Sequence, residues 1–256
     1  MSLRYMQPYD DEIALVNEVT IAQALKNLDY KHVHIQSGRG ITKRNNRADI
    51  ELYDEGPKHL LVNEFSSAVL NWTLAAPLAG DIGVKINDPF IRNKASAFRK
   101  SIGWLESVPN IKGPTFTFSH LYPLHTPYVF LKDGSVRPNA TVPPDTELGR
   151  ELYVEAVIYT NSVLEQTVDK LLSESETEPI IIIQGDHSAW GMPWSLHIAK
   201  DELAQRTAVF NSIYLPENCR TGLYSGNSRR CDALGRDGKA LGACGTNSSS
   251  AQQSNI

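Results

Sequence analysis

Two adjacent residues with metal-binding side chains, Asp186 and His187, follow four consecutive isoleucines in the stretch EPIIIIQGDHSAWG (178–191). A carboxylate oxygen and an imidazole nitrogen suit Zn²⁺ or Mn²⁺, whereas Ca²⁺ prefers oxygen ligands alone. A protein metal site usually has three or four ligands, so this pair would be only part of one. The alternative is that Asp186 caps the turn after the strand, as aspartate often does.

Two further histidines, His120 and His125, lie in the segment SHLYPLHTPY (119–128), which two prolines stiffen. Imidazole titrates near neutral pH, so both side chains are candidates to face an anionic substrate as proton donors. The competing interpretation makes His120 a partly buried, hydrogen-bonded residue and His125 a solvated one. No role is assigned to the other four histidines of the chain, His32, His34, His59 and His197.

The polar clusters follow segments that have the pattern of β-strands. Residues 31–38 (KHVHIQSG) alternate with period two and place Val33 and Ile35 on one face, and residues 115–118 (TFTF) alternate likewise. Residues 179–185 (PIIIIQG) form a continuous β-branched run, which suits a strand covered on both faces of a mostly parallel sheet. Ligands of open α/β sheets bind outside the carboxyl ends of the strands. If these strands are parallel neighbours, their polar ends share one rim.

Helical periodicity alternates with these strands along the chain. We expect helices over residues 12–30, 64–78, 94–108 and 147–173. Further strands are predicted near residues 50–53 and over 206–216. This alternation predicts an α/β fold with a mostly parallel sheet sandwiched by helices.

The strongest helical pattern is that of residues 147–173. Its apolar stripe is predicted to consist of Val154, Val157, Leu164, Val168 and Leu171. Asn161 falls inside this stripe and is therefore expected to be a buried hydrogen-bonding residue.

The composition is that of a globular protein: 256 residues, 41% hydrophobic and 21% charged. A formal charge of −4 gives no reason to expect nucleic acid as a partner. The sequence has no apolar run long enough to span a bilayer, and its start does not resemble a signal peptide. The three cysteines, Cys219, Cys231 and Cys244, match no zinc spacing, and their odd number argues against a complete disulfide framework. Residues 221–256 are rich in glycine and serine and are expected to form a disordered tail.

Three segments together resemble one known family. Residues 113–134 (GPTFTFSHLYPLHTPYVFLKDG), 152–172 (LYVEAVIYTNSVLEQTVDKLL) and 179–191 (PIIIIQGDHSAWG) occur in the order and spacing of the sulfatase-like members of the alkaline phosphatase superfamily. They are most similar to bacterial sulfatase-like hydrolases and transferases related to lipoteichoic acid synthases. The resemblance runs from about residue 10 to residue 216. It implies a partial sulfatase-like α/β domain over residues 1–220.

The resemblance also implies roles for particular residues. Asp186 and His187 match the family's metal-binding Asp-His pair, and the implied cofactor is a divalent ion, Mn²⁺, Zn²⁺ or Ca²⁺. His125 matches the histidine that contacts the sulfate or phosphate group, and His120 is placed in the same pocket. The family's usual Asp-His-Gly here ends in Ser188. The implied substrate is a small anionic ester or a lipid-linked or glycan ester, and sulfate and phosphate remain equal alternatives.

One departure from the family bears on activity. The family's nucleophile and first acidic metal ligand precede the segment equivalent to RYMQPYDDEIALVNE (4–18), where this chain begins. We therefore expect a carboxyl-terminal portion that is inactive alone, with an unpaired sheet edge that favours a dimer. The alternative is a non-catalytic module that retains the fold and binds anions or a partner. Family members often lie outside the cytoplasm behind a membrane anchor, and the chain itself assigns no compartment.

Overall fold

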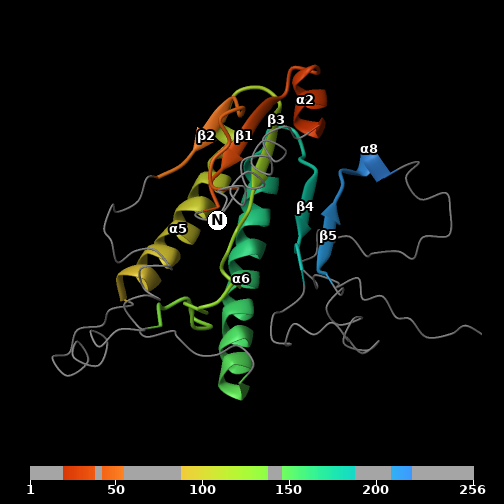
Figure 1. Ribbon diagram of the computed structural model, residues 1–256. Helices are drawn as coiled ribbons and strands as arrows, with labels where there is room; N and C mark the ends of the chain where they lie inside the picture. Colours follow the sequence, from red (N-terminus) through yellow and green to blue (C-terminus); the bar gives the residue numbers. More distant parts are fainter. Residues whose placement is uncertain (1–19, 38–41, 55–87, 138–145, 188–208, 221–256) are drawn as a thin grey trace, which may run out of the picture. The chain divides into compact units, whose positions relative to one another are not determined.

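The computed structural model in Figure 1 describes residues 20–37, 42–54, 88–137, 146–187 and 209–220. The chain divides into two compact units, Met1–Ser175 and Glu176–Ile256, and each unit has a sheet of its own. The fold is mixed α/β, with a small parallel sheet and helices in the first unit. The coarse fold class predicted from the sequence is thereby confirmed.

The sheet of the first unit is parallel and has the strand order β2-β1-β3. Its strands are β1 (Lys31–Ile35), β2 (Ile50–Leu52) and β3 (Thr115–Ser119). The first two lie within the segments predicted as strands, and β3 extends one residue beyond the predicted 115–118. Ile35 is in register with Leu52 on one side and with Ser119 on the other, so the three carboxyl ends meet at one edge. We call this the carboxyl edge. As predicted, the polar residues that follow β1 and β3 share it, whereas Asp186 and His187 follow a strand of the other sheet.

The central strand β1 is buried on both of its faces. Val33 and Ile35 are fully buried on one face, as their alternation predicts. His32 and His34 on the opposite face are also buried, although no role was assigned to them from the sequence. Strands of parallel sheets are usually covered on both faces by other elements, and β1 contacts α2 and α5, so its polar residues must find partners inside the protein.

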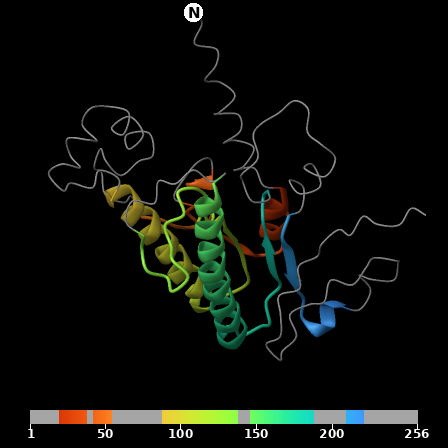
Figure 2. The same cartoon turned by 90° about the horizontal axis from the view of Figure 1, so that it is seen from below.

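Four helical segments accompany this sheet. They are α2 (Thr20–Lys26), α5 (Asp88–Glu106), the 3₁₀ turn η4 (Val108–Asn110) and α6 (Glu147–Glu174). In both views α5 and α6 lie beside each other, and α5 also contacts β1 (Figures 1 and 2). The described part of α2 and nearly all of α6 occur where the sequence predicted helices; α2 ends at Lys26, before the predicted end at residue 30, and α5 begins at Asp88, six residues before the predicted start. The predicted helix over 64–78 and residues 12–19 of the first predicted helix lie outside the described residues.

The main hydrophobic core lies between α5, α6 and the segment that follows β3. Side chains at helical spacing on α5 pack against Val129 and Phe130, and Tyr159 of α6 closes the same cluster. The α5 residues are Ile91, Ala95, Phe98 and Ile102. A second cluster joins Tyr128 to Leu152 and Ala156 of α6. The segment that carries His120 and His125 is therefore anchored by apolar burial immediately after the two histidines.

The helix α6 confirms the predicted span, but its buried stripe differs from the predicted one. Val154 is 53% exposed and Asn161 is exposed, so neither belongs to the buried face. The buried positions are Gly149, Leu152, Ala156, Thr160, Thr167 and Val168. The helix buries small residues and threonines because the core segment approaches it closely, and Thr160 and Thr167 satisfy their hydroxyls on Ala156 O and Val163 O.

The second unit corrects the prediction for the isoleucine run. The strand β4 (Ile181–Gln184) pairs antiparallel with β5 (Asn211–Tyr214), not in the parallel sheet. Ile180 and Ile182 are 57% and 62% exposed, whereas Ile181 and Ile183 are partly buried. The run is thus covered on one face only, as is usual for an antiparallel pair. A short helix, α8 (Glu217–Arg220), follows β5.

Within the described ranges, no helix combines the length and the apolar character that a bilayer span requires. Cys219 is a free thiol, and Cys231 and Cys244 lie outside the described residues together with the predicted tail, 221–256. Residues 206–208, at the start of the strand predicted over 206–216, also lie outside the described residues.

Candidate functional site

His120 lies directly after β3, at the carboxyl edge of the parallel sheet. Its Nδ1 is 2.9 Å from the hydroxyl oxygen of Thr42, a residue of the connection between β1 and β2. Thr42 is buried, and His120 is half-buried. The sheet therefore brings a hydroxyl and an imidazole into contact from two separate connections, at the edge where ligands of parallel sheets bind.

The backbone of Thr42 is held by a residue of the central strand β1. The Nε2 of His34 donates to the carbonyl oxygen of Thr42 at 2.9 Å. His34 is fully buried, lies opposite Glu51 in the β1–β2 register and stacks on Phe118 of β3 with ring centroids 5.7 Å apart. The hydrogen bond and the stacking fix the orientation of the His34 ring, and through it the position of Thr42.

The residues after Thr42 are held by a second set of contacts. Arg44 donates to both carboxylate oxygens of Glu51, at 2.8 and 2.7 Å, and the backbone N–H of Asn45 donates to Glu51 at 2.7 Å. These hydrogen bonds hold the pKa of the Glu51 carboxyl below its usual value, the pairing with Arg44 contributing most. A bidentate arginine–carboxylate pair has one preferred geometry, so it fixes the loop that positions the Thr42 hydroxyl.

The electrostatics of His34 favour the neutral ring. Burial lowers the pKa of His34 from its ordinary value of 6.5, outweighing the hydrogen bond to Thr42, which acts in the opposite direction. A neutral ring whose Nε2 donates carries its lone pair on Nδ1, and Nδ1 has no hydrogen-bond partner within the described part of the chain. His34 thus acts as a buried donor to the loop and not as a proton carrier at the surface.

Tyr122 lies between the two histidines predicted as site residues. Its ring centroid is 4.4 Å from that of His120 and 5.9 Å from that of His125, the latter in an edge-on arrangement. The structure therefore brings His120 and His125 to one aromatic group. Tyr122 is an addition that the sequence did not suggest.

His125 is held by its own segment and by α5. Its Nδ1 donates to the carbonyl oxygen of Thr126 at 2.7 Å, which fixes the orientation of the ring. The ammonium of Lys94 donates to the carbonyl of His125 and, at 2.9 Å, to that of Pro127. Lys94 thereby links the segment that carries His125 to α5 and places a positive charge next to that segment.

Two more polar atoms are buried at the carboxyl edge. The side-chain oxygens of Gln36 and Ser119 have no hydrogen-bond partner among the residues the structure describes. Gln36 directly follows β1, and its backbone N–H continues the pairing with Leu52 at 3.1 Å. Ser119 ends β3. Unsatisfied buried oxygens are costly and tend to occur where a structure has a functional demand.

Asp186 and His187 lie in the second unit, at the end of β4. An Asp186 carboxylate oxygen accepts the backbone N–H of His187 at 3.0 Å and lies 3.7 Å from its Nε2. Both side chains are exposed, at 66% and 54%. The aspartate therefore contacts the backbone of the next residue, and the carboxylate oxygen and the imidazole nitrogen lie close enough to share an ion.

The side chains of Asp186 and His187 have donor atoms that suit a divalent ion, but a site needs more than two ligands. A carboxylate and an imidazole suit Zn²⁺ or Mn²⁺ chemically. Across the described ranges, however, no three histidine, cysteine, aspartate or glutamate side chains gather in a way that could hold a metal ion. Among the described residues, Asp186 and His187 therefore remain two candidate ligands, fewer than the three or four of a usual metal site.

His34, Thr42 and Lys94 are the supporting residues that sequence reasoning missed. The alternation of residues 31–38 places His34 within a strand, which is a usable signal for burial. The partnership of Thr42 with His120 has no sequence signal, because it joins residues separated by 78 positions.

Comparisons with models of protein families, with curated proteins and with solved structures found no match to this chain.

Proposed function

We propose that the chain carries the oxyanion-binding histidines of a sulfatase-like hydrolase or transferase that acts on a sulfate or phosphate ester. The observation that supports the proposal is the grouping of His120 and His125 around Tyr122 at the carboxyl edge of a parallel sheet. Such an edge is the usual ligand site of α/β sheets. The proposal also depends on the sequence resemblance of residues 113–191 to the sulfatase-like family.

The two imidazoles suit a tetrahedral oxyanion. When protonated, each presents N–H donors and a positive charge to an anion. In a complete enzyme, His125 would stabilise the transferred group or protonate the leaving oxygen, with His120 beside it. Thr42 would hold His120 in one orientation.

Asp186 and His187 are proposed to contribute two ligands of a divalent metal site. A metal ion supplies Lewis-acid stabilisation of the ester oxygens when it is bound. In this chain, Asp186 and His187 would contribute a carboxylate and an imidazole to such an ion. An alkaline-phosphatase-like architecture for the first unit is part of the same proposal, supported by its parallel sheet with helices α5 and α6.

The test of the proposal begins with anion binding. Inorganic phosphate and sulfate are titrated into the protein in metal-free buffer, and the imidazole signals of His120 and His125 are followed by NMR. We expect both sets of signals to shift together and His125→Gln to weaken binding about tenfold, the loss of one charge-assisted hydrogen bond. His187→Gln is the matched control, because the same substitution is made at an exposed histidine of the other unit.

The two readings of the site differ in metal binding, since this chain is expected to be inactive alone under either of them. Weak binding of Mn²⁺ that is lost in His187→Ala would support the hydrolase fragment. Anion binding with equal metal uptake by wild type and His187→Ala would favour the alternative, a non-catalytic anion-binding module. Imidazole signals that respond to neither anion would overturn both.

A further inference from the structure

Two contacts in series connect the buried strand β1 to the histidine site. The Nε2 of His34 donates to the carbonyl oxygen of Thr42 at 2.9 Å, and the hydroxyl oxygen of the same threonine lies 2.9 Å from Nδ1 of His120. His34 and Thr42 are buried, whereas His120 is half-buried. A change in the state of the His34 ring can therefore reach His120 through a single residue.

The buried ring of His34 cannot accommodate a second proton where it lies. Its Nε2 carries the first proton, because the Thr42 carbonyl can only accept. Its Nδ1 is buried and has no hydrogen-bond partner within the described ranges. A proton on Nδ1 would create a buried charge and a donor without an acceptor, and both are costly. A protonated His34 therefore favours a conformation in which the ring has left this position.

The charges next to the ring oppose one another. Glu51 of β2 lies opposite His34 in the register and favours its charged form, whereas Arg44, which pairs with Glu51, disfavours it. His32 is on the same face of β1, with its ring centroid 6.5 Å from that of His34, and a proton on one ring disfavours a proton on the other. From β3 the ring of Phe118 is uncharged. Burial is the largest influence and lowers the pKa of His34.

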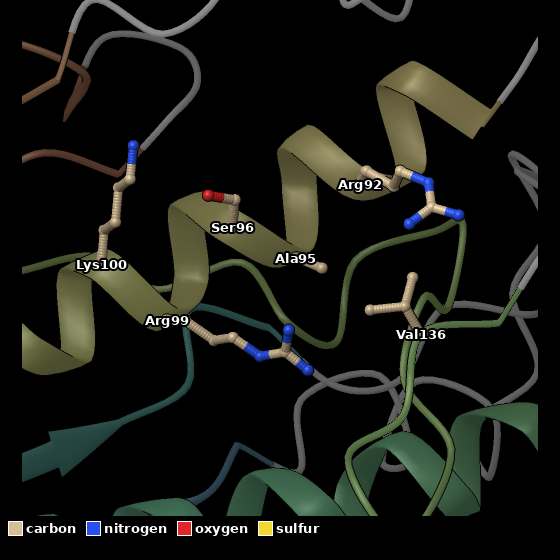
Figure 3. A pocket seen from close by; sticks show the side chains of 6 residues that line it. All are labelled: Arg92, Ala95, Ser96, Arg99, Lys100 and Val136. Atoms are coloured by element: carbon tan, nitrogen blue, oxygen red, sulfur yellow. The ribbon is translucent and has the colours of Figure 1, made fainter.

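The helices that contact β1 bring further charges. Lys26 of α2 pairs with Asp49 at 3.0 Å, and both act on His32. The helix α5 also contacts β1. Its cationic side chains line a separate pocket, drawn in Figure 3: Arg92, Arg99 and Lys100. Among the described residues, the acidic group that acts directly on His34 is therefore Glu51.

Glu51 also holds the segment that carries Thr42. Its carboxylate accepts from the guanidinium of Arg44 and from the backbone N–H of Asn45. A charged His34 ring that turns toward Glu51 competes with these donors for the same carboxylate. Release of the ring would therefore weaken both holds on the segment, the bond to the Thr42 carbonyl and the bonds to Glu51.

We propose that His34 is an acid-sensitive latch of the histidine site: when the ring takes up a proton it releases Thr42, and Thr42 no longer holds His120. The effect on anion binding rests on the proposed function, whereas the release of Thr42 does not. Acid then acts on the site in two opposite ways. Protonation of His120 and His125 strengthens anion binding, and protonation of His34 weakens it by freeing His120. The released state should gain about tenfold in population for each pH unit below about 6.5, until the folded ring itself titrates.

The release is measured by NMR of the Thr42 methyl group between about pH 7.5 and about pH 5. The background is His120→Gln, in which a change of this signal cannot come from the His120 ring. We expect the signal to move below about pH 6.5 and to stop moving when His34→Gln is added, since glutamine donates to the carbonyl but does not titrate. His32→Gln is the matched control, a second buried histidine on the same face of β1, and should keep the movement.

Two further readings protect this test. The methyl signals of Ile91 and Val129, both fully buried, should stay constant, which shows that the release is local. The ¹⁵N signals of the His34 ring should report protonation over the same pH range as the movement of the Thr42 methyl signal. This coincidence is measured without replacing His34, so it holds even if His34→Gln does not fold.

The effect on the site is measured with sulfate, which keeps two negative charges across this pH range. In wild type we expect its affinity to rise as the pH falls toward about 6.5 and then to drop, by about pH 5, about three- to tenfold below that of His34→Gln. Thr42→Val, which lacks the contact with His120, should bind more weakly and show no drop. His187→Gln, at an exposed histidine of the other unit, should keep the profile of wild type.

The outcomes judge the latch and the proposed function separately. A Thr42 methyl signal that moves only when His34 can titrate supports the latch, as does a drop in sulfate affinity that His34→Gln removes. A methyl signal that is constant with pH, or one that moves equally in His34→Gln, would overturn it, and so would identical sulfate profiles in wild type and His34→Gln. Failure to bind sulfate at every pH would overturn the proposed function, and the Thr42 methyl signal would then decide on the latch alone.

Discussion

The hydroxyl oxygen of Thr42 lies 2.9 Å from Nδ1 of His120. Thr42 belongs to the segment between β1 and β2, so this contact joins that segment to the end of β3. Because the carbonyl of the same threonine accepts from His34, one residue joins the buried strand to the imidazole at the carboxyl edge. This contact is the most specific support that the structure gives for an ordered histidine site.

Thr42→Val should release the His120 ring while keeping the size of the side chain. The ¹⁵N shifts of the His120 imidazole should move toward those of a freely exchanging tautomer mixture, and phosphate binding should weaken about three- to tenfold, the worth of one hydrogen bond. Thr42→Ser retains the hydroxyl and should restore both properties. A valine variant with unchanged ¹⁵N shifts would remove Thr42 as a positioning residue.

His34 should make stability depend on pH. Its pKa is lower in the folded protein than the ordinary 6.5, so below that pH the unfolded chain binds a proton that the folded chain does not. The free energy of unfolding should therefore fall as the pH drops through about 6.5 toward the folded pKa. Urea unfolding at about pH 7.5 and about pH 5.5 measures this loss, above the range in which carboxyl groups titrate.

His34→Gln supplies the matched variant, since the glutamine amide can still donate to the Thr42 carbonyl but does not titrate. It should show a smaller loss of stability between the two pH values. Burial also lowers the pKa of His32, so part of the dependence should remain and disappear only when His32 is replaced as well. An equal pH dependence in wild type and His34→Gln would contradict this prediction.

Lys94→Met should loosen the His125 segment from α5. The variant loses two donations, to the carbonyls of His125 and Pro127, and should be destabilised by about 1–3 kcal/mol. Phosphate binding at His125 should weaken in parallel, measured by the imidazole shifts. Lys132→Met, at an exposed position, is expected to stay within about 0.5 kcal/mol of wild type.

Gly134→Ala and Gly103→Ala should have opposite effects on stability. Gly134 has a φ of +83°, and a methyl group there would collide with the ring of Tyr159, so we expect a loss of about 1–3 kcal/mol. Gly103 is an exposed helical residue with open space around it, so alanine should stabilise the protein by roughly 0.5–1 kcal/mol. Equal changes in urea unfolding would show that the turn at Gly134 adapts to a side chain.

Asp186 and His187 should bind Mn²⁺ or Zn²⁺ weakly, because two ligands alone bind a divalent ion less tightly than a full set. Calorimetric titration should show the loss of that binding in His187→Ala, with His125→Ala as a control that retains it. Equal metal uptake by wild type and His187→Ala would leave the pair with only the turn contact between Asp186 and the backbone of His187.

The sequence by itself determined the elements whose signals are local. The period-two alternation of residues 31–38 and 115–118 and the helical pattern of 94–108 and 147–173 predicted β1, β3, α5 and α6. It also marked His120 and His125, since two imidazoles on a proline-containing segment after a strand are visible without a structure.

Only the tertiary structure decided which residues meet. A run of isoleucines has the same local pattern whether its partner is parallel or antiparallel, so the exposed, antiparallel pairing of β4 with β5 was not predictable from it. Helical periodicity likewise placed Val154 and Asn161 on the buried face of α6, but the side that is buried depends on what packs there. The contact of Thr42 with His120 exists because the β2-β1-β3 order brings two distant connections to one edge, and strand order is a property of the whole sheet.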